Sequence, residues 1–233
     1  MTGATPDLRH VETWIFDLDN TLYPASCNLF HQIDWRMTEF IAGRLELARD
    51  DARRLQKDLF RRHGTTLAGL MAEHALEPAP FLAFVHDIDL SPVAPAPDLD
   101  RALDALPGRK LVFTNGSVRH AENVLGRLGV ARHFEALFDI AAAGYMPKPR
   151  PEPYRALLDR HAVDPRRALM AEDIARNLVP AAALGMTTLW VRGEADWASA
   201  GAEEDHVHFA ADDLAAWLTA VADARPIRGS PTG

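Results

Sequence analysis

The chain has 233 residues, of which 48% are hydrophobic, which is enough for a globular protein with one compound domain or a core carrying an inserted module. Its formal net charge of -8, from 33 acidic against 25 basic residues, argues against nonspecific binding to nucleic acid or to anionic membranes, because both need an excess of Lys and Arg. Three features predict a cytoplasmic protein. The chain has a single cysteine, Cys27, residues 1–10 lack a basic segment followed by an apolar one, and no apolar span reaches about 18 residues.

The first predicted element is a buried strand that ends in two carboxylates. Its β-forming run, Thr13 to Phe16, is followed by Asp17 and Asp19. Two carboxylates this close repel each other unless a cation or a shared proton offsets them, which favours a hard divalent metal ion. A strand end capped by Asp and Asn in a turn explains the same residues without any chemistry. The rest of the chain has to decide between these two interpretations.

Residues 24–94 are interpreted as an all-helical insert. Apolar residues at helical spacing predict helices near 30–41, 50–63, 67–74 and 81–88. The basic cluster between Arg53 and Arg62 is interpreted as a solvated helix face, because acidic residues are interleaved and no aromatic platform accompanies it. A proline-rich stretch, residues 91–97, then predicts a stiff linker.

Beyond the linker, predicted strands and helices alternate. Strands are expected over 110–114, 136–140, 168–171, 187–191 and 207–210, and helices over 118–128, 152–161, 176–184 and 212–221. This alternation is typical of an α/β fold with a doubly wound parallel sheet and right-handed crossovers. We assign residues 11–23 and 95–225 to this core, residues 24–94 to a helical cap, and residues 1–10 and 226–233 to flexible termini.

Polar residues follow four of the predicted strands, and in an open parallel sheet ligands bind beyond the carboxyl ends of the strands. Asp17 is a candidate nucleophile, because a carboxylate can attack phosphorus and form an aspartyl-phosphate intermediate. Asp19 can protonate the leaving alkoxide and then, as a carboxylate, activate water. Each motif is weak by itself, but their order at successive strand ends favours phosphoryl transfer.

The later strand ends supply the remaining parts of such a site. Thr114, Asn115 and Gly116 combine a hydroxyl, a glycine and backbone amides at a helix start, which form a cradle for phosphate. A compact ammonium such as that of Lys148 offsets the charges of both a carboxylate and a phosphate. Glu172 and Asp173 complete a set of oxygen ligands suited to Mg²⁺.

Together these motifs resemble the haloacid dehalogenase (HAD) superfamily, subfamily IA, from Trp14 to Val191. The sequences of four segments are similar to those of the pyrimidine 5'-nucleotidase branch, namely residues 16–23, 64–70, 86–89 and 177–180. The resemblance implies a Rossmann-like core with a cap, and a Mg²⁺-dependent phosphomonoesterase acting on a small phosphorylated metabolite such as a nucleoside 5'-monophosphate. It also implies roles for the acidic residues: Asp17 as nucleophile and metal ligand, Asp19 as acid/base with its carbonyl on the metal, Asp173 as metal ligand, and Glu172 in the metal shell.

Other functions remain open at this point. A phosphatase or phosphomutase for a sugar phosphate or phosphoglycolate would use the same residues, and a non-catalytic protein could keep the fold. Dehalogenation is disfavoured, because the dehalogenase branch works without a metal and lacks the acid equivalent to Asp19. A dinucleotide-dependent oxidoreductase is disfavoured because no G-x-G-x-x-G follows the first strand.

Five further polar residues lie outside the motifs at the strand ends. In the cap, His63, His86 and Asp87 are predicted to face the substrate. His206 and His208, beside an acidic run, are interpreted as alternate residues entering the last strand, and no metal site is predicted there.

Overall fold

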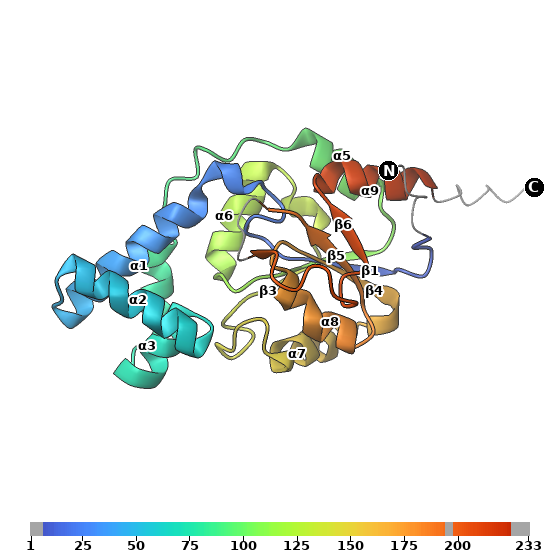
Figure 1. Cartoon of the computed structure of the whole chain (residues 1–233). Coiled ribbons are helices and arrows are strands. Elements are labelled where there is room, and N and C mark those ends of the chain that lie inside the picture. Colours follow the sequence, from blue (N-terminus) through green and yellow to red (C-terminus); the bar gives the residue numbers. More distant parts are fainter. Residues whose placement is uncertain (1–6, 194–197, 225–233) are drawn as a thin grey trace, which may run out of the picture.

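The computed structural model describes residues 7–193 and 198–224 and contains a six-stranded parallel sheet (Figure 1). The strand order is β3-β2-β1-β4-β5-β6, with every neighbouring pair parallel, so the predicted doubly wound α/β sheet is confirmed. The first strand therefore lies in the middle of the sheet, with β2 on one side and β4 on the other. The strands are β1 (Thr13–Phe16), β2 (Arg109–Phe113), β3 (Ala136–Phe138), β4 (Ala168–Glu172), β5 (Thr187–Val191) and β6 (Phe209–Ala211).

Alternating side chains of the buried strands supply the apolar layers on both faces of the sheet. On β1, Trp14 and Phe16 join one hydrophobic cluster, while Ile15 joins the cluster on the opposite face. The first cluster also takes side chains from α5 (Pro97–Ala105), α6 (Val118–Leu128) and α9 (Leu214–Ala224), and the second takes them from α7 (Pro151–His161) and α8 (Val179–Ala183). Burial on both faces explains why β1 is apolar from Trp14 to Phe16.

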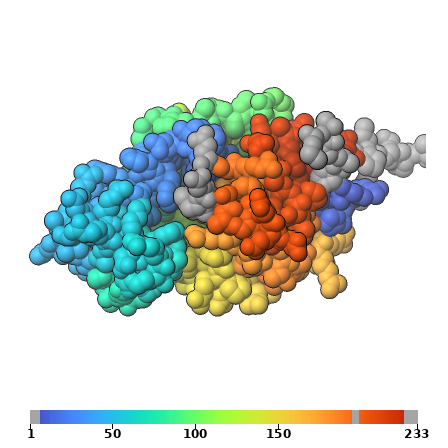
Figure 2. All heavy atoms as spheres, viewed as in Figure 1, coloured from blue at the N-terminus to red at the C-terminus, as the bar shows by residue number. Residues whose placement is uncertain are grey.

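The first four α-helices after β1 form the predicted cap, seen as a lobe beside the sheet in Figure 1 and at the left of the surface in Figure 2. They share a third hydrophobic cluster, to which Ile140 of the core segment after β3 also contributes. Gly64, in the left-handed region at φ 82°, ends the second helix, and the Thr65 side chain caps the third by accepting from the amide of Ala68 at 3.1 Å. The helices are α1 (Leu29–Leu45), α2 (Arg49–His63), α3 (Thr66–His74) and α4 (Pro78–Val85). No helix among the described residues combines the length and apolar character needed to cross a membrane.

Several element boundaries differ from the sequence-based predictions. Helix α5 was not predicted, because its N-terminal proline, Pro97, was assigned to the linker, whereas a proline is well tolerated in the first turn of a helix. The predicted helix over 176–184 begins as a 3-10 turn, Ala175–Leu178, and the last strand starts at Phe209 rather than Val207. Leu8, assigned to a flexible terminus, is buried in the core. The predicted flexible segments 1–6 and 226–233 lie outside the described residues.

Candidate active site

The ends of β1 and β4 bring three of the predicted site residues together. Because Phe16 is in register with Ala171, Asp17 and Glu172 come from adjacent strand ends. Between them lies the Lys148 ammonium, 2.7 Å from Asp17 Oδ1 and 2.7 Å from Glu172 Oε2. All three side chains are buried. The structure thus assembles residues that are far apart in the sequence, at the edge of the sheet where the sequence predicted a site.

The acidic side chains of this cluster outnumber the positive ones. One carboxylate oxygen from each of Asp17, Glu172 and Asp173 lies within 4.8 Å of the others. Burial and the charge of Glu172 raise the pKa of Asp17 to about 7, although Lys148 opposes the shift. Burial and the charges of Glu172 and Asp17 raise the pKa of Asp173 to about 10. One ammonium does not offset three buried carboxylates, so this cluster favours a further cation.

The donor set of this cluster fits a magnesium ion. Mg²⁺ prefers oxygen ligands, few of them from the protein, and keeps several waters. The carboxylates of Asp17 and Asp173 are the residues that would hold it, with Glu172 beside them. When bound, the ion would supply positive charge against the phosphate and against the repelling carboxylates. Within the described part of the chain, this is the group of acidic side chains whose spacing suits a metal ion.

The nucleophile candidate is held in one orientation by its neighbours. Thr21 Oγ1 donates a hydrogen bond of 3.0 Å to Asp17 Oδ2, while Lys148 donates to Oδ1. The backbone amide of Asp17 donates to the carbonyl of Ala171 at 2.9 Å, which continues the sheet pairing one residue past the strand. The carboxylate is therefore preorganised, as a nucleophile in a displacement has to be. The positioning role of Thr21 was not assigned from the sequence.

The loop after β2 carries the predicted phosphate-binding residues. Thr114 Oγ1 accepts from the amide of Gly116 at 2.9 Å, and this loop leads into α6. The side chain of Asn115 is bonded to the backbone of Lys148, accepting from its amide at 2.8 Å and donating to its carbonyl at 3.3 Å. Asn115 thus positions the lysine segment, which is a second task beside the predicted contact with phosphate.

The acid/base candidate, Asp19, is bonded to two residues that sequence reasoning did not assign. Tyr23 donates its hydroxyl to Asp19 Oδ1 at 2.6 Å, and His120 Nε2 lies 2.7 Å from the same oxygen. Burial would raise the pKa of Asp19, but the charge of His120 and both hydrogen bonds lower it to about 2. The Asp19 charge in turn raises the pKa of His120 against the effect of burial. The spacing of Tyr23, four residues after Asp19, was the one signal available in the sequence.

The three predicted cap residues lie in different surroundings. His86 reaches the core, with Nδ1 2.9 Å from Ser117 Oγ at the start of α6. His63 Nε2 lies 2.5 Å from Glu73 Oε1, within the cap. Asp87 is exposed and pairs with Arg36 of α1 at 2.9 Å. Their roles in substrate binding remain predictions, and among them His86 contacts the loop that carries the phosphate residues.

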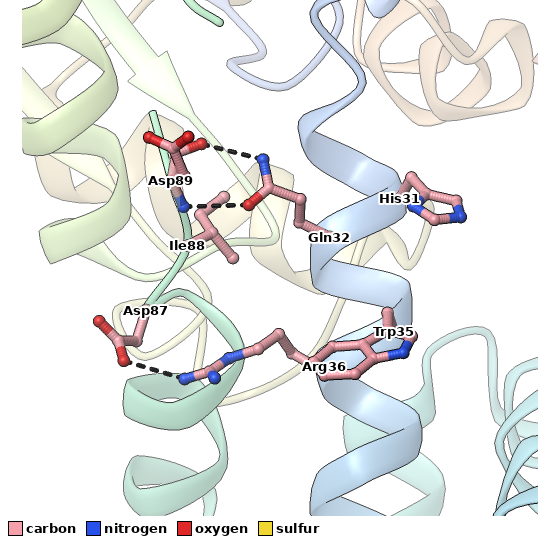
Figure 3. Close-up of a pocket in the computed structure, with 7 residues that line it drawn as sticks. All are labelled: His31, Gln32, Trp35, Arg36, Asp87, Ile88 and Asp89. Atoms are coloured by element: carbon pink, nitrogen blue, oxygen red, sulfur yellow. Dashed lines mark hydrogen bonds and ion pairs between the residues drawn. The ribbon is translucent and has the colours of Figure 1, made fainter. Parts of the chain in front are cut away.

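Asp87 belongs to a groove of about 450 Å³ on the cap (Figure 3). In this groove the Gln32 amide pairs with the backbone of Asp89, donating to its carbonyl at 2.9 Å and accepting from its amide at 3.0 Å. These bonds join α1 to the segment that leaves the cap. The lining residues are His31, Gln32, Trp35, Arg36, Asp87, Ile88 and Asp89, and none of them is a predicted catalytic residue.

The histidines near the last strand form hydrogen bonds with other segments of the core. His208 Nδ1 lies 2.7 Å from Thr188 Oγ1, and His206 Nε2 lies 3.1 Å from the carbonyl of Ala175. Both contacts tie the segment before β6 to neighbouring parts of the core. Both residues precede β6, which begins at Phe209.

Comparisons with known proteins give the same fold. The chain resembles solved structures of a HAD phosphatase from Thermococcus onnurineus (17% identity, 86% of this chain and 93% of that chain covered, TM-score 0.58) and a 2-haloacid dehalogenase from Pseudomonas syringae (18%, 91% and 99%, 0.57). It also resembles a magnesium-bound HAD hydrolase from Bacillus subtilis (14%, 91% and 98%, 0.56). Residues 11–185 match the family model of haloacid dehalogenase-like hydrolases. Since this match covers most of the chain, the protein belongs to the haloacid dehalogenase-like hydrolase family.

Proposed function

We propose that the protein is a Mg²⁺-dependent phosphomonoesterase that acts through an aspartyl phosphate on Asp17. The observation that carries this proposal is the second carboxylate, Asp19, held near the phosphate loop beside a buried acidic cluster. An alkoxide leaving from phosphorus needs a proton, whereas a halide leaving from carbon does not. A hydrolase with both acids is thus better suited to phosphate esters than to haloacids.

The chain's own residues can perform both half-reactions. In the first, an Asp17 carboxylate oxygen attacks phosphorus, the bond to the ester oxygen breaks, and Asp19 gives its proton to the departing alkoxide. In the second, Asp19 takes a proton from water as that water attacks phosphorus, which releases inorganic phosphate and restores Asp17. A phosphate dianion in the loop would raise the pKa of Asp19 from its low value and so help it to hold the first proton.

In this scheme, Lys148 and the loop after β2 bind and orient the phosphate group of the substrate. The Lys148 ammonium already contacts Asp17 and Glu172, and a phosphate beside Asp17 would bring negative charge within its reach. The amides of the Thr114 to Gly116 loop and the start of α6 suit the remaining phosphate oxygens. We infer that residues 24–94 cover this site as one unit over the core formed by residues 11–23 and 95–225, which would exclude water during attack.

The proposed substrate is a small phosphorylated metabolite, with a pyrimidine nucleoside 5'-monophosphate first and a sugar phosphate or phosphoglycolate as alternatives. The proposed substrate rests on the sequences of the cap segments. From the charge and the cysteine content we infer a cytoplasmic enzyme without nucleic-acid or membrane partners. Comparing kcat/KM for UMP, CMP, sugar phosphates and phosphoglycolate tests it. Sugar phosphates well ahead of UMP and CMP would overturn the nucleotidase assignment and leave the phosphatase assignment standing.

The reaction class is tested with p-nitrophenyl phosphate. The wild type is expected to release p-nitrophenol and inorganic phosphate with Mg²⁺ and to be inactive in EDTA, and Asp17→Asn is expected to be inactive in both. Transfer of phosphate to a second hydroxyl, without release to water, would indicate a phosphomutase. Release of halide from a 2-haloacid in EDTA, without phosphatase activity, would overturn the proposal in favour of dehalogenation.

A further inference from the structure

A chain of contacts connects the cap to Asp19. His86, the residue that follows α4, stacks on His120 of α6 with ring centroids 4.5 Å apart and planes 13° apart. Its Nδ1 lies 2.9 Å from Ser117 Oγ, which also caps α6 by accepting from the amide of His120 at 3.3 Å. The His120 ring therefore lies between a cap side chain on its face and Asp19 at its edge.

The contacts on Asp19 are unequally shared between its two oxygens. Both Tyr23 and His120 bond to Oδ1. Oδ2 is directed to the phosphate loop, because it lies 3.7 Å from the position that a Cβ would occupy on Gly116. Because two donors hold Oδ1, the carboxylate cannot rotate to exchange Oδ1 with Oδ2. The other oxygen then points at the loop where the leaving group is protonated in the proposed reaction.

The cap contact fixes the His120 ring in turn. His120 is 1% exposed, so its ring cannot turn towards solvent to satisfy its nitrogens. The stacked His86 covers one face of the ring, and the backbone of Gly116 lies against its edge, where an added Cβ would be 3.3 Å from His120 Cδ2. A ring packed in this way can donate to Asp19 in one orientation only.

We propose that His120 is a positioning residue that, held by His86 of the cap, fixes Asp19 for proton transfer to the leaving group. This inference rests on the proposed phosphomonoesterase function. If His86 holds His120, proton transfer depends on the packing of the cap against the core, because moving the cap away would remove the His86 ring from His120. A histidine that merely fills space in the core would instead affect every substrate through stability alone.

The test compares two substrates of similar size that differ in their need for an acid. p-Nitrophenolate leaves without a proton, whereas the alkoxide of benzyl phosphate needs one. kcat/KM reports the steps up to the departure of the leaving group, so the later hydrolysis of the intermediate does not affect it. The wild type, His120→Leu, His120→Asn and His120→Gln are assayed with Mg²⁺, with His133→Leu as the control, because His133 also pairs with an aspartate of the core, Asp100, at 2.8 Å.

For His120→Leu we expect kcat/KM to fall about 100-fold with benzyl phosphate and less than about fivefold with p-nitrophenyl phosphate. His120→Gln, whose amide extends to the place of Nε2, should recover most of the loss, and the shorter His120→Asn should not. His86→Leu should show the same selective loss at about tenfold, and His133→Leu no selective loss. If His120→Leu does not fold, the difference between His120→Gln and His120→Asn still tests the positioning role.

Equal losses with both substrates, or equal behaviour of His120→Gln and His120→Asn, would overturn the positioning role while the phosphatase assignment stands. A wild type that hydrolyses neither ester would overturn the proposed function, and this inference with it.

Discussion

The ammonium of Lys148 donates to Asp17 over 2.7 Å, and both side chains are buried. Removing a single partner of a buried ion pair leaves an uncompensated charge. We therefore expect Lys148→Met to lower the free energy of unfolding by about 3–5 kcal/mol in EDTA, measured by urea denaturation. The variant should also lose phosphatase activity.

Lys57→Met is the matched control for this variant. Lys57 also pairs with an aspartate, Asp34, at 2.5 Å, but its side chain is 44% exposed. Its loss should cost about 1 kcal/mol or less and leave activity unchanged. Equal destabilisation by the two substitutions would contradict the view that Lys148 offsets buried negative charge.

Asp173→Asn should increase stability while it removes function. The pKa of Asp173 is raised by burial and by the charges of Glu172 and Asp17, so its ionised form is unfavourable in the metal-free fold. Replacing it by the neutral amide is expected to raise the Tm in EDTA by a few degrees and to abolish both the Mg²⁺-induced rise in Tm and phosphatase activity. A lower Tm in EDTA would show that its charge is compensated by contacts other than a metal.

The stabilisation by Mg²⁺ should increase with pH. The folded-state pKa values of Asp17 and Asp173, about 7 and about 10, exceed the ordinary value of 3.8. Without metal, the stability that these two groups contribute is therefore fully present below about pH 4 and is lost as the pH rises through the folded-state values. Mg²⁺ binds the ionised carboxylates, so its binding strengthens over the same range. Thermal melts at pH 5.5, 7 and 8.5 should show a growing difference between Mg²⁺ and EDTA. A difference that is constant over this range would argue against these groups as ligands.

Gly116→Ala should lower phosphatase activity by disturbing the proposed phosphate-binding loop. An added Cβ would lie 3.2 Å from Thr114 Oγ1 and 3.3 Å from His120 Cδ2, closer than side-chain contacts normally are. We expect kcat/KM for p-nitrophenyl phosphate to fall at least tenfold, because the loop must shift to accept the methyl group. Gly126→Ala is the control, since an added Cβ there meets nothing within 4 Å. Full activity of Gly116→Ala would mean that the loop does not closely approach the phosphate.

The central sheet and the buried acidic cluster with Lys148 were predictable because both follow from local patterns. Buried strands appear as apolar runs, and parallel strands place their carboxyl ends at one edge, so Asp17, Lys148 and Asp173 could be placed together before their distances were known. The assignment of Asn115 was less complete, because its bonds to the backbone of Lys148 come from a loop whose path no periodicity describes.

The His120 contact with Asp19 could not be predicted from spacing. The two residues are 101 positions apart, and His120 lies on a helix whose other buried positions are ordinary core residues. The cap histidine that supports it comes from a third segment. A contact among three distant segments depends on how the cap packs against the core, which sequence patterns do not specify.

The central claim, that Asp17 carries the phosphoryl group, is tested most directly by trapping the intermediate. p-Nitrophenyl phosphate labelled on phosphorus, whose leaving group needs no proton from Asp19, is mixed with the enzyme and Mg²⁺ and quenched in acid within one turnover. The label on protein is then measured and mapped by mass spectrometry. We expect label on the peptide containing Asp17 in the wild type and in Asp19→Asn, and none in Asp17→Asn. Labelling of another residue, or turnover by Asp17→Asn at the wild-type rate, would contradict it.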